Sequence, residues 1–131
     1  MTFPSTKKPR VLLLDWSKNY LLELLQKNVD LVTFGESDTD WYERFPASQF
    51  RGQIAAVVRQ EEYELIILGN NMGAGIKLAE LIPEEARAKI VVASHLGLEE
   101  SEEYQYRTLG VSRFSFRKDV YDLVSDLAVH Q

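Results

Sequence analysis

The feature that most constrains the fold of this chain is a set of short apolar runs separated by helix-like segments. Three runs, at residues 10–15, 64–69 and 89–94, are nearly continuous in Leu, Ile and Val, and two more lie at 29–34 and 113–116. Continuous apolar runs of this length are typical of strands that are buried on both faces, as in parallel sheets. The runs therefore predict five strands of a parallel sheet.

The segments between the runs have the spacing of helices. Apolar residues recur every three or four positions in several of them, Pro83 predicts the end of one helix, and Gly110 predicts the end of another. Strand and helix alternate five times, which is typical of a doubly wound α/β sheet with right-handed crossovers and helices on both faces. The expected helices cover residues 17–28, 48–60, 78–82, 99–109 and 118–130.

Length and composition exclude several classes of protein. The 131 residues suit one domain, with residues 1–9 expected to be disordered and residues 10–131 to form the domain. A net charge of −5 argues against nucleic acid as a partner. The chain has no apolar run long enough to cross a membrane, so no membrane partner is expected. The absence of cysteine fits a cytoplasmic protein.

In open α/β sheets, ligands bind at the carboxyl ends of the strands. The informative positions are therefore Asp15, Gly69, Ser94 and the residues after Phe116. At these positions the chain resembles the receiver domains of two-component response regulators, over Arg10 to Val129. The stretches that carry the resemblance are RVLLLDWS, ELIILGNNMGAGIKLAELI, KIVVAS and LGVSRFSFRKD. The resemblance implies a single (βα)5 domain of the flavodoxin-like, CheY-like class, with strand order 2-1-3-4-5.

The resemblance also implies a phosphorylation site, and here the chain departs from the family. Receiver domains carry an acidic pair after the first strand, a phosphoacceptor aspartate at the end of the third, a hydroxyl after the fourth and a lysine after the fifth. By this comparison the chain retains the hydroxyl but lacks the phosphoacceptor, so the resemblance implies a degenerate pseudo-receiver. The corresponding residues are Asp15 and Trp16, then Gly69, Ser94 and Arg117.

These departures bear directly on the chemistry. Aspartyl phosphate formation needs a nucleophilic carboxylate, and Mg²⁺ needs oxygen ligands, usually carboxylates. Gly69 has no side chain, and Asp15 alone is a poor site for Mg²⁺. Asp15 is interpreted as a solvated carboxylate or as a partner of Arg117, and Arg117 as that partner or as a contact for an anion. We therefore expect no catalytic residue, no metal and no cofactor.

The glycine-rich loop at 69–75 allows two interpretations. It is either a tight turn in which glycines adopt positive φ, or a cradle that holds a nucleotide, a flavin or another anion at a helix N-terminus. Its spacing matches neither the P-loop nor the dinucleotide-binding fingerprint, which favours the tight turn. The second interpretation describes a small-ligand sensor.

Aromatic residues gather in the last helix-strand-helix unit. Phe114 and Phe116 share one side of a strand and are either core residues or part of a docking surface. Tyr104 and Tyr106 lie in an acidic helix with few other apolar residues, so at least one of them should be exposed. In receiver domains this face carries partner docking and dimer contacts. The predicted interaction surface consists of Tyr104, Tyr106, Phe114, Phe116 and Tyr121.

The sequence thus predicts a non-enzymatic protein of signal transduction that acts by phosphorylation-independent protein–protein interaction. Its partner is expected to be a signalling protein, or a second copy of the chain bound through the last helix-strand-helix face. Two alternatives stay open: the small-ligand sensor at the 69–75 loop, and a receiver that is phosphorylated at an unconventional carboxylate.

Overall fold

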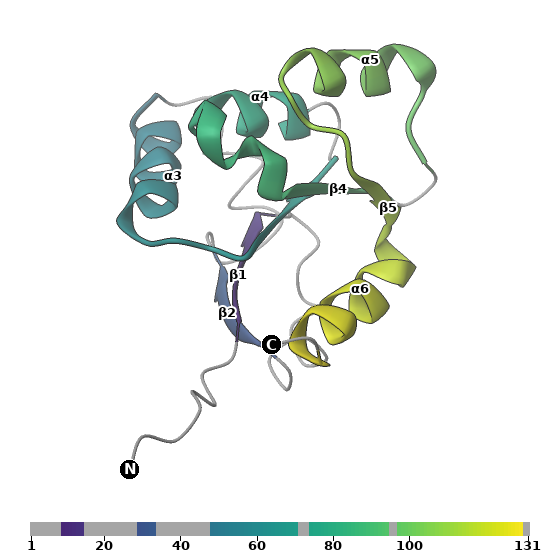
Figure 1. Ribbon diagram of the computed structural model, residues 1–131. Coiled ribbons are helices and arrows are strands. Elements are labelled where there is room, and N and C mark those ends of the chain that lie inside the picture. Colours follow the sequence, from purple (N-terminus) through teal and green to yellow (C-terminus); the bar gives the residue numbers. More distant parts are fainter. Residues whose placement is uncertain (1–8, 15–28, 34–47, 71–73, 95–96, 130–131) are drawn as a thin grey trace.

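The computed structural model describes residues 9–14, 29–33, 48–70, 74–94 and 97–129 (Figure 1). Five strands form one parallel sheet in the order β2-β1-β3-β4-β5. The predicted fold class and strand order are therefore confirmed. The strands are β1 (Arg10–Leu14), β2 (Asp30–Thr33), β3 (Leu65–Gly69), β4 (Ile90–Ser94) and β5 (Phe114–Phe116).

The described helices follow the predicted segments closely. The helix expected after Pro46 is present and runs from Ser48 to Gln60, whereas the segment expected as a helix at 17–28 and the first eight residues lie outside the described ranges. Pro9 is buried, and its carbonyl oxygen accepts a hydrogen bond of 2.9 Å from the backbone N–H of Asp30. The helices are α3 (Ser48–Gln60), α4 (Ala74–Leu81), the 3₁₀ helix η1 (Glu84–Lys89), α5 (Glu100–Thr108) and α6 (Arg117–Val129).

The sheet separates two hydrophobic clusters, because successive side chains of a buried strand point to opposite faces. Leu12, Ile66 and Val92 face the layer formed by α3, α4 and α5, whereas Leu13 and Ile67 face α6. Figure 1 shows α3, α4 and α5 on one side of the sheet and α6 on the other. Both faces of β1, β3 and β4 are thereby covered, which explains their unbroken apolar sequences.

Local chemistry sets the ends of α5. Glu99 and Glu102 form a capping box at its N-terminus, in which each side chain accepts a hydrogen bond from the other's backbone N–H. At its C-terminus, Gly110 adopts a positive φ of 94°, and the N–H of Val111 bonds to the carbonyl oxygen of Tyr106 at 3.0 Å. Glycine adopts this backbone conformation without strain, so the predicted helix end at Gly110 is confirmed.

The helix η1 was not predicted, because its sequence EEARAK has no apolar periodicity. It is held by Arg87, whose side chain donates hydrogen bonds to the carbonyl oxygens of Ile82 and Leu109 at 3.0 and 3.2 Å. Arg87 thus ties the segment after α4 to the end of α5. None of the described helices is both long and apolar enough to cross a membrane.

Candidate functional site

The candidate site lies at the carboxyl edge of the sheet, where the register brings the strand ends together. Gly69, the last residue of β3, is paired with Ala93, and Ser94, the last residue of β4, is paired with Phe116. The backbone N–H of Asn70 donates to the carbonyl oxygen of Ala93 at 2.9 Å. Since Gly69 has no side chain, the first side chain after β3 at this edge belongs to Asn70.

The side chain of Asn70 joins this edge to α5. The Tyr106 hydroxyl donates to Asn70 Oδ1 at 2.7 Å, and Asn70 Nδ2 donates to Glu102 Oε2 at 3.0 Å. The second oxygen of Glu102 accepts the backbone N–H of Glu99 at 3.2 Å and so closes the capping box. One amide therefore connects the end of β3 to the first turn and the buried face of α5.

Gly75, in the first turn of α4, makes room for this network. A Cβ at this position would lie 2.0 Å from the Tyr106 hydroxyl oxygen and 3.0 Å from the carbonyl oxygen of Gly69. Among the described glycines, only Gly97 and Gly110 have positive φ. The expectation that the loop glycines serve positive φ is therefore wrong for Gly69 and Gly75, and Gly73 lies outside the described residues. Gly75 instead allows the Tyr106 hydroxyl to lie close to the backbone of α4.

Burial changes the acid–base behaviour of Tyr106. Its side chain is fully buried, and desolvation, followed by the negative charge of Glu102, raises its pKa above the usual value of 10. The phenol thus stays protonated and remains a hydrogen-bond donor to Asn70. Tyr106 also packs edge-on against Phe114, with the ring centroids 6.0 Å apart.

Ser94 lies beside this network, at the floor of a small cavity. The serine is buried, and the cavity of about 180 Å³ opens between the end of β4, the start of α5 and β5. The other described residues that line it are Gly97, Leu98, Glu103, Phe114, Ser115 and Phe116. The cavity is large enough for one side chain of a partner but well below the volume of pockets that enclose small ligands, about 300 Å³ or more.

Exposed aromatic rings lie on both α5 and β5. Tyr104 is 73% exposed and Phe116 is 45% exposed, which makes them the exposed large hydrophobic residues of the described chain. Arg107 lies over the ring of Phe114 and Lys118 over that of Phe116, at 5.2 and 5.6 Å from the ring centroids. We call these five residues the α5–β5 face.

The predicted site residues are placed as follows. Asp15 and Trp16 lie outside the described residues, and so do the side chains of Arg117 and Tyr121, which belong to α6. Gly69 and Ser94 meet at the same edge, as expected from their strand ends. The expectation that one of the two α5 tyrosines is exposed is confirmed by Tyr104.

Tyr106 requires a correction, because its assignment to the interaction surface is wrong. Tyr106 is 0% exposed, since it lies two positions after Tyr104 on the opposite side of α5 and points at the sheet edge. Phe114 is half-buried, with part of its ring in the core beside Tyr106. Within the described residues, no three His, Cys, Asp or Glu side chains gather as a metal site.

The network of Asn70, Gly75, Glu102 and Tyr106 was missed in the sequence. One signal was available: Glu102 and Tyr106 are four residues apart and so share a helical face. The role of Asn70 could not be predicted, because nothing in the sequence shows that an amide after the third strand would reach that face of the helix.

No protein-family model and no curated protein sequence matches the chain. Solved structures do resemble it. A receiver domain of a Francisella response regulator is 14% identical, with 94% of this chain and 98% of that one covered and a TM-score of 0.60. A sensor protein from Polaromonas is 20% identical, with 93% of both chains covered and a TM-score of 0.60.

A third similar structure is the receiver domain of a sensor histidine kinase from Pseudomonas aeruginosa, in which a magnesium ion is coordinated in the active-site cleft. It is 9% identical, the alignment covers 93% of this chain and 98% of that one, and the TM-score is 0.58. At these identities the likeness establishes the fold. The chain therefore has the fold of receiver domains, the α/β class defined by the strand order 2-1-3-4-5.

Gly75→Ala should destabilise the fold by about 1–3 kcal/mol, because the added methyl group collides with the Tyr106 hydroxyl. Tyr106→Phe removes the colliding oxygen. The free energy of unfolding of the double variant should therefore be about 1 kcal/mol higher than the value obtained by adding the two single effects. Urea unfolding of all four proteins measures this coupling.

Gly52→Ala is the matched control. Gly52 lies inside α3 with no atom within 4 Å of an added Cβ, so the same substitution should stabilise the protein by about 0.5–1 kcal/mol. Strictly additive effects of Gly75→Ala and Tyr106→Phe would contradict the contact.

The raised pKa of Tyr106 predicts a loss of stability in alkali. Above pH 10, the usual pKa of tyrosine, the unfolded chain releases this proton while the folded chain retains it, so the free energy of unfolding falls as pH rises. Urea unfolding between about pH 9 and 11 should show a shallower fall for Tyr106→Phe than for the wild type. Tyr63, whose pKa burial also raises, accounts for part of the remaining fall. Equal slopes would contradict the prediction.

Proposed function

We propose that this chain is a pseudo-receiver domain that acts in signal transduction by binding a partner protein independently of phosphorylation. It would have no enzymatic activity and no cofactor, and would work in the cytoplasm as part of a two-component type of pathway. The receiver fold supports the general class of signalling protein. The particular mode of action rests on the carboxyl edge of the sheet.

The observation that carries the proposal is the network at the end of β3. Gly69 supplies no nucleophile, and the next side chain is an amide, which is a poor nucleophile. Both ends of that amide are occupied, by the Tyr106 hydroxyl and by Glu102. Hydrogen bonds within the protein thus occupy the first side chain after the phosphoacceptor position, and this arrangement favours a fixed state of the domain over a phosphorylation switch.

The same network supports the α5–β5 face as the binding surface. α5 is held at its N-terminus by Glu102 and on its buried face by Tyr106, so its outer face is presented on a fixed element. Aromatic and Arg side chains are enriched in protein interfaces, and Tyr and Arg are enriched among the residues that dominate binding energy. The α5–β5 face offers exposed Tyr104, Phe116 and Arg107. The partner would be a signalling protein or a second copy of this chain.

Treatment with acetyl phosphate and Mg²⁺ tests the independence from phosphorylation. The intact mass of the protein should stay unchanged, because the end of β3 offers no acceptor carboxylate. A conventional receiver domain treated in parallel verifies that the reagent is active. A stable phosphoryl adduct on this chain would overturn the proposal and favour an unconventional acceptor.

Substitution at the α5–β5 face tests the binding surface. Tyr104→Ala and Phe116→Ala should each weaken capture of the partner, or self-association, by about tenfold, because truncation of an aromatic anchor typically costs more than 1 kcal/mol. Quantitative pull-down from the native lysate measures capture of the partner, and light scattering of the purified protein measures self-association.

Gln49→Ala serves as the control, since Gln49 is exposed on α3, which Figure 1 places at the other end of the helical layer from α5. Tyr106→Ala is unsuitable, because it removes a buried side chain. Binding that responds equally to all three substitutions, or to none, would contradict the assignment of this surface.

A further inference from the structure

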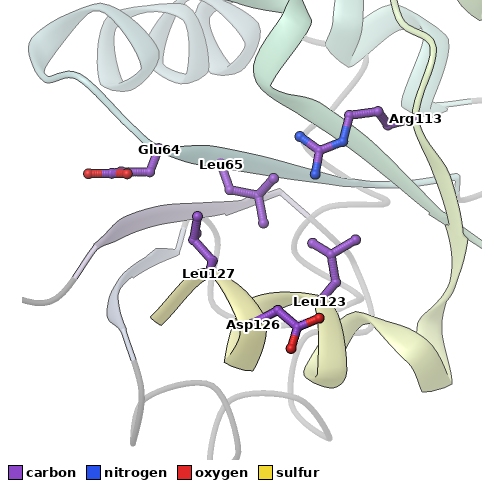
Figure 2. Close-up of a pocket in the computed structure, with 6 residues that line it drawn as sticks. All are labelled: Glu64, Leu65, Arg113, Leu123, Asp126 and Leu127. Atoms are coloured by element: carbon purple, nitrogen blue, oxygen red, sulfur yellow. The ribbon is translucent and has the colours of Figure 1, made fainter. Parts of the chain in front are cut away.

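A second cavity lies at the amino edge of the sheet, opposite the candidate site. Its volume is about 540 Å³, and it opens between the starts of β3 and β5 and the last turns of α6 (Figure 2). This volume falls within the range of about 300–1,000 Å³ that is typical of small-molecule sites. The described residues that line it are Glu64, Leu65, Arg113, Leu123, Asp126 and Leu127.

Three leucines form the apolar wall of this cavity. Leu65 points from the sheet towards α6, whereas Leu123 and Leu127 point from α6 towards the sheet (Figure 2). Leu65 is 1% exposed, and the two helical leucines are half-buried and lie one turn apart on one face of α6. An apolar group in the cavity would extend the hydrophobic cluster between the sheet and α6.

Arg113 places a cation over these leucines. It precedes Phe114, which packs on the opposite face of the sheet, so the alternation of side chains directs Arg113 towards α6. Its backbone is fixed, because its carbonyl oxygen accepts the N–H of Val92 at 3.0 Å. Figure 2 shows the guanidinium group above Leu123.

The charge of Arg113 has no partner within the described part of the chain. Arg10, another arginine at this edge, differs in this respect, since it forms ion pairs with both Asp30 and Glu61. A guanidinium group that lies beside apolar side chains and lacks a carboxylate is well suited to bind one from a ligand.

The opposite rim of the cavity is negative. Asp126 directly precedes Leu127 on α6 and, like Arg113, forms no ion pair with a described residue. The carboxylate of Glu64 points away from the leucines (Figure 2). The lining thus presents a cation on the sheet side, a carboxylate on the helix side and leucines between them.

We propose that this cavity binds a small zwitterion with an apolar side chain, of the chemical class of the free apolar α-amino acids. The carboxylate of the ligand pairs with Arg113, its ammonium group faces Asp126, and its side chain packs on Leu65, Leu123 and Leu127. This site is separate from the α5–β5 face, so it adds a ligand-binding function that does not depend on the proposed partner binding.

Titration of the ¹⁵N-labelled full chain with L-leucine tests the proposal. We expect a dissociation constant of about 1 mM, with amide shifts at residues 64–65, 113 and 123–127 and none at Ser94. Two analogues separate the charges: 4-methylpentanoate lacks the ammonium group, and 3-methylbutylamine lacks the carboxylate. Each should bind about fivefold more weakly, the scale expected for the loss of one solvent-accessible charge pair.

Two charge-removing variants with matched controls complete the experiment. Arg113→Gln and Asp126→Asn should each weaken L-leucine binding about fivefold, whereas Arg59→Gln on α3 and Asp119→Asn in the first turn of α6 should leave it unchanged. All four residues are exposed, so the variants should keep the wild-type melting temperature. No shifts up to about 50 mM ligand, equal binding of either analogue, or equal effects of the control variants would overturn the proposal.

Discussion

The hydroxyl group of Tyr106 reaches the carboxyl edge of the sheet only because residue 75 carries no side chain. That single clearance in α4 lets one phenol, one amide and one carboxylate join the end of β3 to α5. Since the phenol is buried, an unpaired hydroxyl there would cost about 1–3 kcal/mol, so the hydrogen bond to Asn70 is a condition for burying the ring at all. The position of α5, and with it the exposed aromatic face, follows from this contact.

Much of the architecture was accessible from the sequence, for a physical reason. Strands buried on both faces need unbroken apolar sequences, and β1, β3 and β4 have them, so their positions and their parallel pairing followed directly. The end of α5 was equally accessible, because Gly110 takes a backbone conformation that other residues avoid. The polar helix η1 could not be predicted from the sequence, since Arg87 holds it through hydrogen bonds to the carbonyl oxygens of Ile82 and Leu109.

The same distinction explains which residues of the candidate site could be predicted from the sequence. Gly69 and Ser94 were placed correctly because they end predicted strands, and parallel strands end at one edge. Tyr106 was misplaced because the count of apolar residues in α5 gave no reason to bury a tyrosine. Tyr106 is buried by contacts with Asn70 and Phe114, which lie outside α5 and which periodicity along one helix does not show. The two ends of the sheet also differ: Asn70, Glu102 and Tyr106 at the carboxyl edge bond to one another, whereas Arg113 and Asp126 at the amino edge line an open cavity.

The orientation of the Asn70 amide restricts which side chains position 70 can carry. Its oxygen accepts from a phenol and its nitrogen donates to a carboxylate, so the two ends are not interchangeable. A carboxylate at position 70 would face the carboxylate of Glu102 and weaken the cap of α5, since like charges in close contact repel. An acidic residue at position 70 would therefore carry a cost in folding. The hydrogen bonds of this single side chain thus favour an amide over a carboxylate directly after β3.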